Sequence, residues 1–385
     1  METFTHQIQV ANTLDVTAVE HELTILWGQT AGVDETSGDD VVMRARAANL
    51  MVYLIAESAL AETHETIGEL SKAHPCRALV MLGETDAEAR DIEMFVTAFA
   101  PDDSHPDKKQ ICCEEVTLSA RGHFTSELPS AAVPLLVPDL RVFLWWRNEM
   151  DPLDKILQSL MRAADRVVID SADFGNTFSN LPALAELFEH QDESAVAVSD
   201  INWARLTSWR ALLANFYDVP DYRTQLENIE SVQIVYVGEN QDEEIAAQPL
   251  LIAGWLASRL GWGVAKGVQT GADTSFEFRN QGRPIGLDFK RVERAAMKPG
   301  RLAQIELRTK KTSEASFLVL RSKDGLHLET HAKMPRRSLP GRTLPVRNRS
   351  TAQLLAREME ILCNDRIYEQ AVKLANQMIA SLKHS

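Results

Sequence analysis

The stretch Asp200-Ile-Asn-Trp-Ala-Arg-Leu-Thr-Ser-Trp-Arg-Ala-Leu-Leu-Ala-Asn-Phe-Tyr-Asp218 lies between two halves of the chain that follow different patterns. Its apolar and aromatic side chains recur at steps of three and four residues, which predicts a helix of about five turns. Asp200 or Asn202 can accept the free backbone N–H groups at the start of this helix. We expect the helix to open the second of two domains.

Two tryptophans and two arginines, Trp203, Arg205, Trp209 and Arg210, lie within eight residues of this stretch. Tryptophan and arginine carry much of the binding energy at protein–protein contacts, and a guanidinium offers an anion a planar fork of donors. The four residues are therefore candidates for partner binding. The alternative is that the tryptophans belong to the core and the arginines pair with nearby carboxylates.

The first half of the chain alternates short apolar runs with helical patterns. Helices are predicted at about residues 40–73, 85–99, 122–136 and 152–164, and strands at about residues 76–82, 111–120, 141–146 and 166–169. Strands that alternate with helices favour a parallel sheet with both faces covered. We therefore predict an α/β domain with a mostly parallel sheet over residues 1–190.

Positive side chains cluster near the start of the first long helix predicted in this domain. Arg44, Arg46 and Asn49 lie there, and cations at a helix N-terminus oppose the helix dipole. Such a placement requires either an internal carboxylate or an external anion. The three residues are candidate anion-binding residues, with an internal ion pair as the alternative.

Aromatic and acidic residues follow two of the predicted strands, where ligands bind in open α/β sheets. Trp145 and Trp146 end one strand, and Asp170 and Asp173 follow another. The two carboxyl groups would suit a catalytic pair, although acids at strand ends more often cap the next helix or line a surface turn. No GxGxxG and no phosphate-binding loop follows these strands, so the dinucleotide signature is missing and we predict no cofactor and no catalytic residue.

The second half of the chain carries runs of alternating polarity separated by turn residues, which predict an antiparallel sheet. A strand at residues 232–237 and an apolar helix at residues 249–260 precede these runs, and Gly254 would permit close approach of another helix. Ser350 caps a final helix predicted over residues 351–382, whose apolar stripe includes Cys363 as a buried thiol. We predict an α+β domain over residues 191–385, with an antiparallel sheet and a long C-terminal helix.

The segment from Lys333 to Arg349 is the clearest basic patch, with six basic residues, three prolines and no acids. Prolines stiffen such a segment into an extended form. Arg336 and Arg337 are candidate contacts for a partner or for a phosphate group. The alternative is a solvated loop that lies over the protein's own acidic surface.

Composition limits the possible partners and the compartment. The 385 residues carry a formal charge of −15, which disfavours nucleic acid and anionic membranes as partners. The four cysteines form no CxxC pair, and His327 and His331 lie on a predicted strand without further ligands, so no metal site is expected. Neither a signal peptide nor a membrane-spanning stretch is recognised, which suggests the cytoplasm.

Four further motifs occur in order along the chain: His74-Pro-Cys-Arg-Ala-Leu-Val80, Pro134-Leu-Leu-Val-Pro-Asp-Leu140, Val142-Phe-Leu-Trp-Trp146 and Ala253-Gly-Trp-Leu-Ala-Ser-Arg-Leu-Gly-Trp262. With the tryptophan helix, they resemble the OpcA family of glucose-6-phosphate dehydrogenase assembly proteins over nearly the whole chain. The resemblance implies a protein that is not an enzyme. It would bind glucose-6-phosphate dehydrogenase and favour its active oligomer as an allosteric activator.

Two other functions remain as alternatives. One is a sugar-phosphate-binding protein or an enzyme of carbohydrate metabolism, which the α/β half and the scattered arginines would suit. The other is a redox sensor, because some OpcA relatives are linked to thioredoxin control. This chain departs from such a sensor, since it has neither a close cysteine pair nor a C-terminal cysteine cluster.

Overall fold

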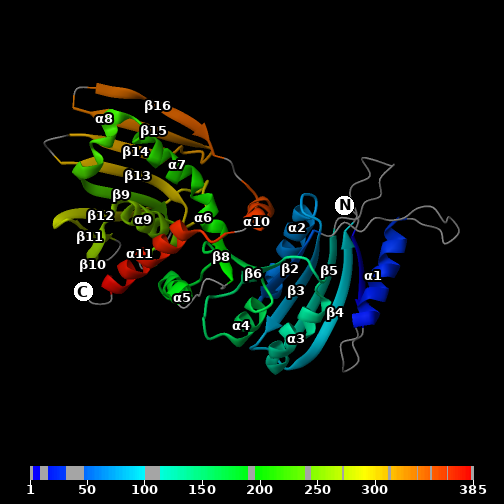
Figure 1. Cartoon of the computed structure of the whole chain (residues 1–385). Coiled ribbons are helices and arrows are strands. Elements are labelled where there is room, and N and C mark those ends of the chain that lie inside the picture. The colour runs from blue at the N-terminus through cyan, green and yellow to red at the C-terminus, as the bar shows by residue number, and fades with distance from the viewer. Residues whose placement is uncertain are drawn as a thin grey trace.

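The computed structural model places two large sheets side by side, each covered by helices (Figure 1). It describes residues 3–8, 16–31, 47–99, 113–189, 196–238, 244–270, 273–310, 314–335, 337–346, 349–361 and 363–382. One apolar cluster runs through both halves of the molecule, and a second lies on one face of the first sheet. The two sheets therefore share a core.

The first sheet is mostly parallel, as predicted, with two antiparallel strands at one edge. Its order is β1 (Thr3–Ile8), β4 (Arg90–Phe99), β5 (Cys113–Arg121), β3 (Cys76–Glu84), β2 (Ala48–Leu54), β6 (Val142–Arg147), β7 (Arg166–Ile169) and β8 (Ala197–Asp200). The helical elements are α1 (Val16–Ala31), η1 (Glu57–Ala59), α2 (Leu60–Leu70), η2 (Gly122–Glu127), α3 (Leu128–Ala132), η3 (Val133–Leu135), α4 (Lys155–Met161) and α5 (Thr177–Glu189).

Two predicted helices of this domain are wrong. The predicted helix over residues 40–73 is, within the described residues, the strand β2 followed by η1 and α2, and the one over residues 85–99 contains β4. All seven residues of β2 are buried. A central strand with both faces covered has an apolar run without period two, which sequence periodicity does not distinguish from a buried helix.

The second sheet is mostly antiparallel, as predicted. Its order is β10 (Gly263–Thr270), β11 (Asp273–Asn280), β12 (Arg283–Val292), β9 (Ile229–Val237), β13 (Leu302–Thr309), β14 (Ser316–Arg321), β15 (His327–Met334) and β16 (Arg337–Pro345), and only β12 and β9 pair in parallel among the described strands. Its helical elements are α6 (Ile201–Arg205), α7 (Thr207–Phe216), α8 (Pro220–Arg223), η4 (Leu226–Asn228) and α9 (Ala247–Leu260).

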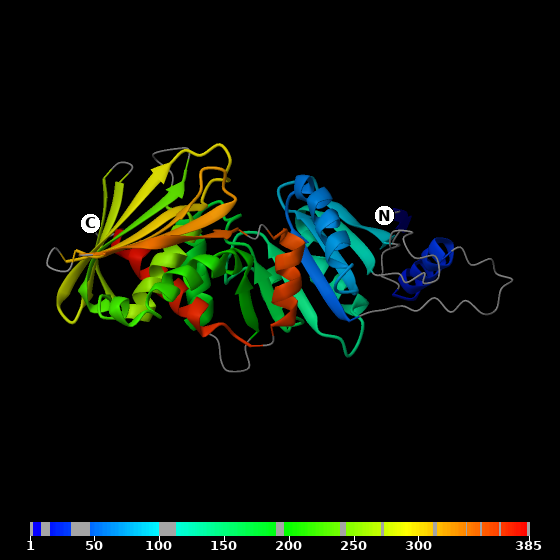
Figure 2. The ribbon, with the colours of Figure 1, turned by 90° about the horizontal axis from the view of Figure 1, so that it is seen from above.

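The chain ends in two helices, α10 (Thr351–Glu360) and α11 (Arg366–Leu382), instead of the single predicted one. Ile361 is extended and ends α10, while the Asp365 side chain accepts the first free N–H groups of α11. Helix α10 packs beside α2 on the first sheet, and α11 packs beside α9 under the second (Figure 2). Cys363 lies in the break and is exposed, so its prediction as a buried thiol is wrong.

The sheets do not divide at residue 190. Strand β8, at residues 197–200, pairs with β7 and completes the first sheet. The chain then crosses to the second sheet and returns with α10. The C-terminal part thus contributes to both halves.

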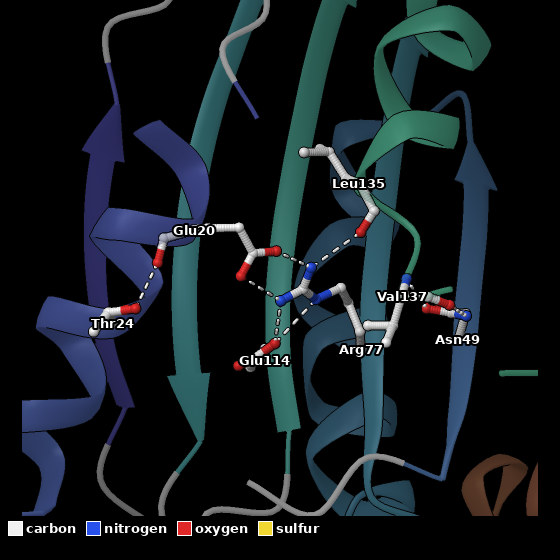
Figure 3. Close-up of polar contacts among 7 residues, drawn as sticks. All are labelled: Glu20, Thr24, Asn49, Arg77, Glu114, Leu135 and Val137. Carbon is white, nitrogen blue, oxygen red and sulfur yellow. Dashed lines mark hydrogen bonds and ion pairs between the residues drawn. The ribbon is translucent and has the colours of Figure 1, made fainter. Parts of the chain in front are cut away.

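A buried ion-pair cluster fixes the first sheet to α1. Arg77 on β3 donates to Glu114 on β5, with an Nη2–Oε2 distance of 2.7 Å, and also to Glu20 on α1 and to the Leu135 carbonyl (Figure 3). Arg77 and Glu114 are 2% and 1% exposed. Arg77 thus places a positive charge between a buried and a part-exposed carboxylate, so its removal leaves two like charges close together, one of them in the core.

We predict that Arg77→Met lowers the free energy of unfolding by about 3–5 kcal/mol, because it removes the guanidinium that compensates the buried Glu114 carboxylate. The matched control is Arg308→Met, since Arg308 pairs with Glu306 at 2.8 Å but is 58% exposed. This control should cost less than about 1 kcal/mol. Urea unfolding of the two variants measures the difference, and equal costs would contradict the interpretation.

Helices α9 and α11 approach closely at Gly254, as its position predicted. A Cβ atom at residue 254 would lie 2.2 Å from the Ala371 carbonyl oxygen of α11. Backbone cannot yield as a flexible side chain would, so only glycine fits at this crossing.

Gly254→Ala should therefore destabilise the protein by about 1–3 kcal/mol through overpacking, although alanine is the better helix former. Gly263→Ala provides the control, because a Cβ there meets nothing within 4 Å. That variant should stay within about 0.5 kcal/mol of the parent. Thermal unfolding compares the two, and a more stable Gly254→Ala protein would refute the close approach.

Candidate functional site

Asp200 is the centre of a buried hydrogen-bond network where the two sheets meet. It ends β8 and caps α6, as predicted, by accepting the Asn202 N–H at 2.8 Å. It also accepts the Ser171 N–H at 3.0 Å and the Ser171 hydroxyl at 2.6 Å. The Tyr368 hydroxyl of α11 donates to the same carboxylate at 3.1 Å. One carboxylate thus joins β7, β8, α6 and α11.

Burial alters the ionisation of this network. It raises the pKa of Asp200 to about 6, helped by the nearby Asp170 charge and opposed by the hydrogen bonds from Ser171 and Asn202. Burial and the Asp200 charge together raise the pKa of Tyr368 well above its ordinary value, so the phenol stays protonated as a donor. Asp200 therefore gains or loses its proton near pH 6.

The acids after β7 face arginine. Asp170 pairs with Arg205 of α6, with 2.6 Å between Oδ1 and Nη1, and also accepts the Ala172 N–H at 3.1 Å. Burial raises the pKa of Asp173, with a further contribution from the Asp170 charge. Asp170 is thus engaged by the arginine and by its own turn, which fits the interpretation of an acid that lines a turn better than that of a free catalytic carboxylate.

The two tryptophans predicted as partner contacts lie in the core. Trp203 and Trp209 are 4% and 1% exposed. The Trp203 indole N–H donates to Asp365 at 2.8 Å. Their side chains offer no surface to a docked partner in this structure, so the alternative interpretation, that they are core residues, describes their placement.

The two arginines of the same stretch also contact the protein's own residues. The Arg210 guanidinium lies 3.4 Å from the centroid of the Trp203 ring and donates to the Thr207 hydroxyl at 3.2 Å. Burial lowers the pKa of Arg210 to about 10. Arg205 pairs with Asp170. The stretch is helical but broken at Leu206, where α6 ends and α7 begins.

The anion-binding candidates do not form a cluster in the part of the chain that the structure describes. Arg44 and Arg46 lie outside the described residues. Asn49 is fully buried on β2, where its amide donates to the Val137 carbonyl and accepts the Val137 N–H, both at 2.9 Å (Figure 3). Its side chain therefore holds the 137–140 segment in place, which corrects the anion-binding prediction for Asn49.

The basic segment forms a hairpin at the edge of the second sheet. Arg336 lies outside the described residues, and Arg337 begins β16, where its backbone pairs with Met334 of β15. Arg342 on β16 is exposed. Prolines in β16 suit an edge strand, because they cannot donate to a further neighbour. A mostly apolar groove of about 910 Å³ lies between this hairpin and α7 and α8, lined by residues such as Leu212, Tyr222 and Leu344.

Two smaller cavities flank the loop that follows β7. One of about 300 Å³ lies at the carboxyl ends of β2 and β6, and includes Trp145, Arg147 and Asp173 in its lining. The other, of about 280 Å³, lies between the loop and the second sheet, and includes Arg291 and Arg301. Phe174 lines both cavities. Sequence reasoning missed Arg301, since a single arginine before a strand has no recognisable spacing.

The described ranges lack two kinds of feature. They contain no group of three or more His, Cys, Asp or Glu residues arranged to hold a metal ion. No helix of these ranges has both the length and the apolar character needed to cross a bilayer.

Comparison with known proteins gives two family matches in order along the chain. Residues 68–186 match the family described as the glucose-6-phosphate dehydrogenase subunit N-terminal domain, and residues 196–372 match the corresponding C-terminal domain. A protein of Nostoc punctiforme named for the OxPP cycle protein OpcA is 35% identical over 194 residues, which are 50% of this chain and 40% of that protein. An OpcA protein of Synechocystis is 29% identical over 193 residues, 50% of this chain and 38% of that protein. The chain thus matches less than half the length of these relatives.

The fold also resembles that of a solved oxidoreductase. KijD10, a 3-ketoreductase from Actinomadura kijaniata solved with TDP-benzene and NADP, matches with a TM-score of 0.51 over 88% of this chain and 98% of that one. The sequences are 11% identical, so the likeness concerns the fold alone. In this chain the loop after β2 reads Ile55-Ala-Glu-Ser-Ala59, without the glycines that let a backbone approach a pyrophosphate.

The raised pKa of Asp200 predicts a pH-dependent stability. The folded-state pKa of about 6 exceeds the ordinary 3.8, so the stability due to Asp200 is fully present below about pH 4 and is lost as pH rises through 6. The free energy of unfolding of the parent minus that of Asp200→Asn should fall by up to about 3 kcal/mol between those limits. Urea unfolding across this pH range measures it.

Asp324→Asn serves as the control without a change in this window. The Ser322 hydroxyl lowers the pKa of Asp324 below its ordinary 3.8, so the corresponding difference should rise with pH only below about pH 4 and stay nearly flat between pH 4 and 6. A parent-minus-Asp200→Asn difference that stays flat, or that rises, would contradict the assignment.

Proposed function

The chain belongs to the OpcA family of glucose-6-phosphate dehydrogenase assembly proteins, and we propose that it binds this dehydrogenase and favours its active oligomer. In this proposal it is a non-catalytic assembly factor and allosteric activator of the oxidative pentose phosphate pathway. It acts in the cytoplasm without a cofactor, and neither nucleic acid nor a membrane is its partner.

The observation that carries this proposal is the pair of family matches. Both halves of the chain match domains described as parts of a dehydrogenase subunit, in the order N-terminal then C-terminal. The contacts at the junction are consistent with it, because Asp170 binds Arg205 and Trp203 binds Asp365 inside the protein. Side chains held by one another in this way stabilise a shape that a partner can recognise.

Activation would follow from linkage. If the protein binds the assembled, substrate-competent state of the dehydrogenase more tightly than the inactive state, it shifts the population towards the former. The coupling free energy equals the difference between the two binding free energies, and is typically about 1–3 kcal/mol. No chemical step by the assembly factor is required.

The proposed docking surface is the β15–β16 hairpin with the adjoining groove. The segment from Lys333 to Arg349 has six basic residues and no acids on a chain of charge −15. Arg342 and Leu344 are exposed there, beside the apolar wall of α7 and α8. The charge favours an acidic face of the dehydrogenase with an apolar centre, because complementary charges guide association and the apolar contacts supply affinity.

Reversal of the hairpin charge should separate binding from folding. We predict that Arg336→Glu/Arg337→Glu weakens binding to the dehydrogenase by about tenfold or more, equivalent to about 1.4 kcal/mol or more, and lowers the activation of the enzyme at low substrate. Biolayer interferometry with the immobilised dehydrogenase measures the affinity, and NADPH production measures the activation.

Arg259→Glu/Arg279→Glu is the matched control, since both arginines are exposed and lie outside the hairpin. It makes the same change in net charge and should leave binding close to that of the parent. If both variants weaken binding equally, the effect comes from the net charge of the protein and not from the hairpin. Unchanged binding of the hairpin variant would move the interface elsewhere.

A further inference from the structure

The cavity between the loop after β7 and the second sheet contains a guanidinium that has no partner among the described residues. Arg301 precedes β13, after a turn at Gly300 with a φ of 77°. Its backbone carbonyl accepts the Val237 N–H at 2.9 Å. The side chain lines the cavity. Among the described residues it has no hydrogen-bond acceptor and no ion-pair partner.

The surroundings of Arg301 lower the pKa of its guanidinium. Burial, together with the nearby Arg205 charge, lowers the pKa of Arg301 to about 10. Asp170 and Asp173 act in the opposite direction but form no ion pair with it. Arg301 is partly buried, and a cation partly withdrawn from water with unsatisfied donors is costly unless an anion joins it. The side chain is therefore poised to gain from a bound anion.

Other parts of the cavity wall would also favour a bound anion. Helix α9 begins there, and its N-cap, Ala246, offers no side-chain acceptor to the free N–H groups of the first turn. These groups carry the positive end of the helix dipole. Arg291 lies on another wall, where its Nε donates to the Tyr236 hydroxyl at 2.7 Å.

One carboxylate, Glu244, also lines the cavity. It accepts the Phe178 N–H at 2.8 Å near the start of α5, so part of its charge is balanced by that helix. Among the described lining residues, the Arg301 guanidinium and the start of α9 are donors that no side-chain acceptor satisfies. The described wall therefore offers free donors to an anion.

We propose that this cavity binds a small phosphate monoester, with the phosphate group on the Arg301 guanidinium and the start of α9. A planar guanidinium binds phosphate through two parallel hydrogen bonds. A cavity of about 280 Å³ has room for a compact phosphorylated molecule and excludes a dinucleotide. The site is independent of dehydrogenase binding, since every contact comes from this chain.

The test uses the purified full chain alone. Isothermal titration calorimetry and thermal unfolding are measured with inorganic phosphate, glucose 6-phosphate and glucose, with chloride added to match the ionic strength. Inorganic phosphate and the ester should bind and raise the melting temperature, and glucose should not. Arg301→Gln should weaken phosphate binding at least about tenfold.

Arg259→Gln, at the exposed C-terminal end of the same helix, should bind phosphate like the parent. Without ligand, Arg301→Gln should melt no lower than the parent, because the substitution removes an unpaired, partly buried charge. If Arg301→Gln does not fold, Arg301→Lys keeps the charge but loses the fork, and should bind phosphate more weakly than the parent.

Three results would overturn the proposal. They are no phosphate-specific binding or stabilisation of the parent at millimolar concentration, parent-like affinity in Arg301→Gln, and binding of free phosphate without binding of the ester. None of these results bears on the association with the dehydrogenase, so the site and the proposed function fail separately.

Discussion

The arrangement of the two sheets depends on the hydrogen bonds that the buried Asp200 carboxylate accepts. Asp200 ends the last strand of the first sheet, caps the helix that leads to the second, and accepts the Tyr368 hydroxyl from the C-terminal helix. A second hydrogen bond joins α6 to the start of α11, where the Trp203 indole N–H donates to Asp365. These contacts and the shared apolar cluster join the two sheets, and two cavities lie at their junction.

This use of polar and aromatic residues explains what the protein can offer to others. Trp203, Arg205 and Arg210 would be strong contact residues on a surface, but here they hold the junction together. The side chains that remain exposed include Arg342 and Leu344 on the β15–β16 hairpin, and Arg301 has no partner among the described residues. The proposed protein contact and the proposed phosphate site use these two places.

Sequence reasoning found the elements that have a clear period or a clear boundary. Residues 166–169 were predicted as a strand and form β7, and the Asp200 cap and the close approach at Gly254 follow from local chemistry. Strand β2 was missed because it is buried on both faces. The break before α11 was missed because the apolar spacing continues across it, while Asp365 restarts the helix. The placement of Trp203 and Arg301 depends on contacts between distant segments, which no local pattern contains.

The central claim is that this chain acts by holding a dehydrogenase and carries out no turnover of its own. Mass photometry of the cognate glucose-6-phosphate dehydrogenase, with and without this protein, tests it most directly. The account predicts a complex that contains both chains and a shift of the dehydrogenase towards its larger oligomer. Two species that keep their separate masses over the accessible concentration range would contradict it.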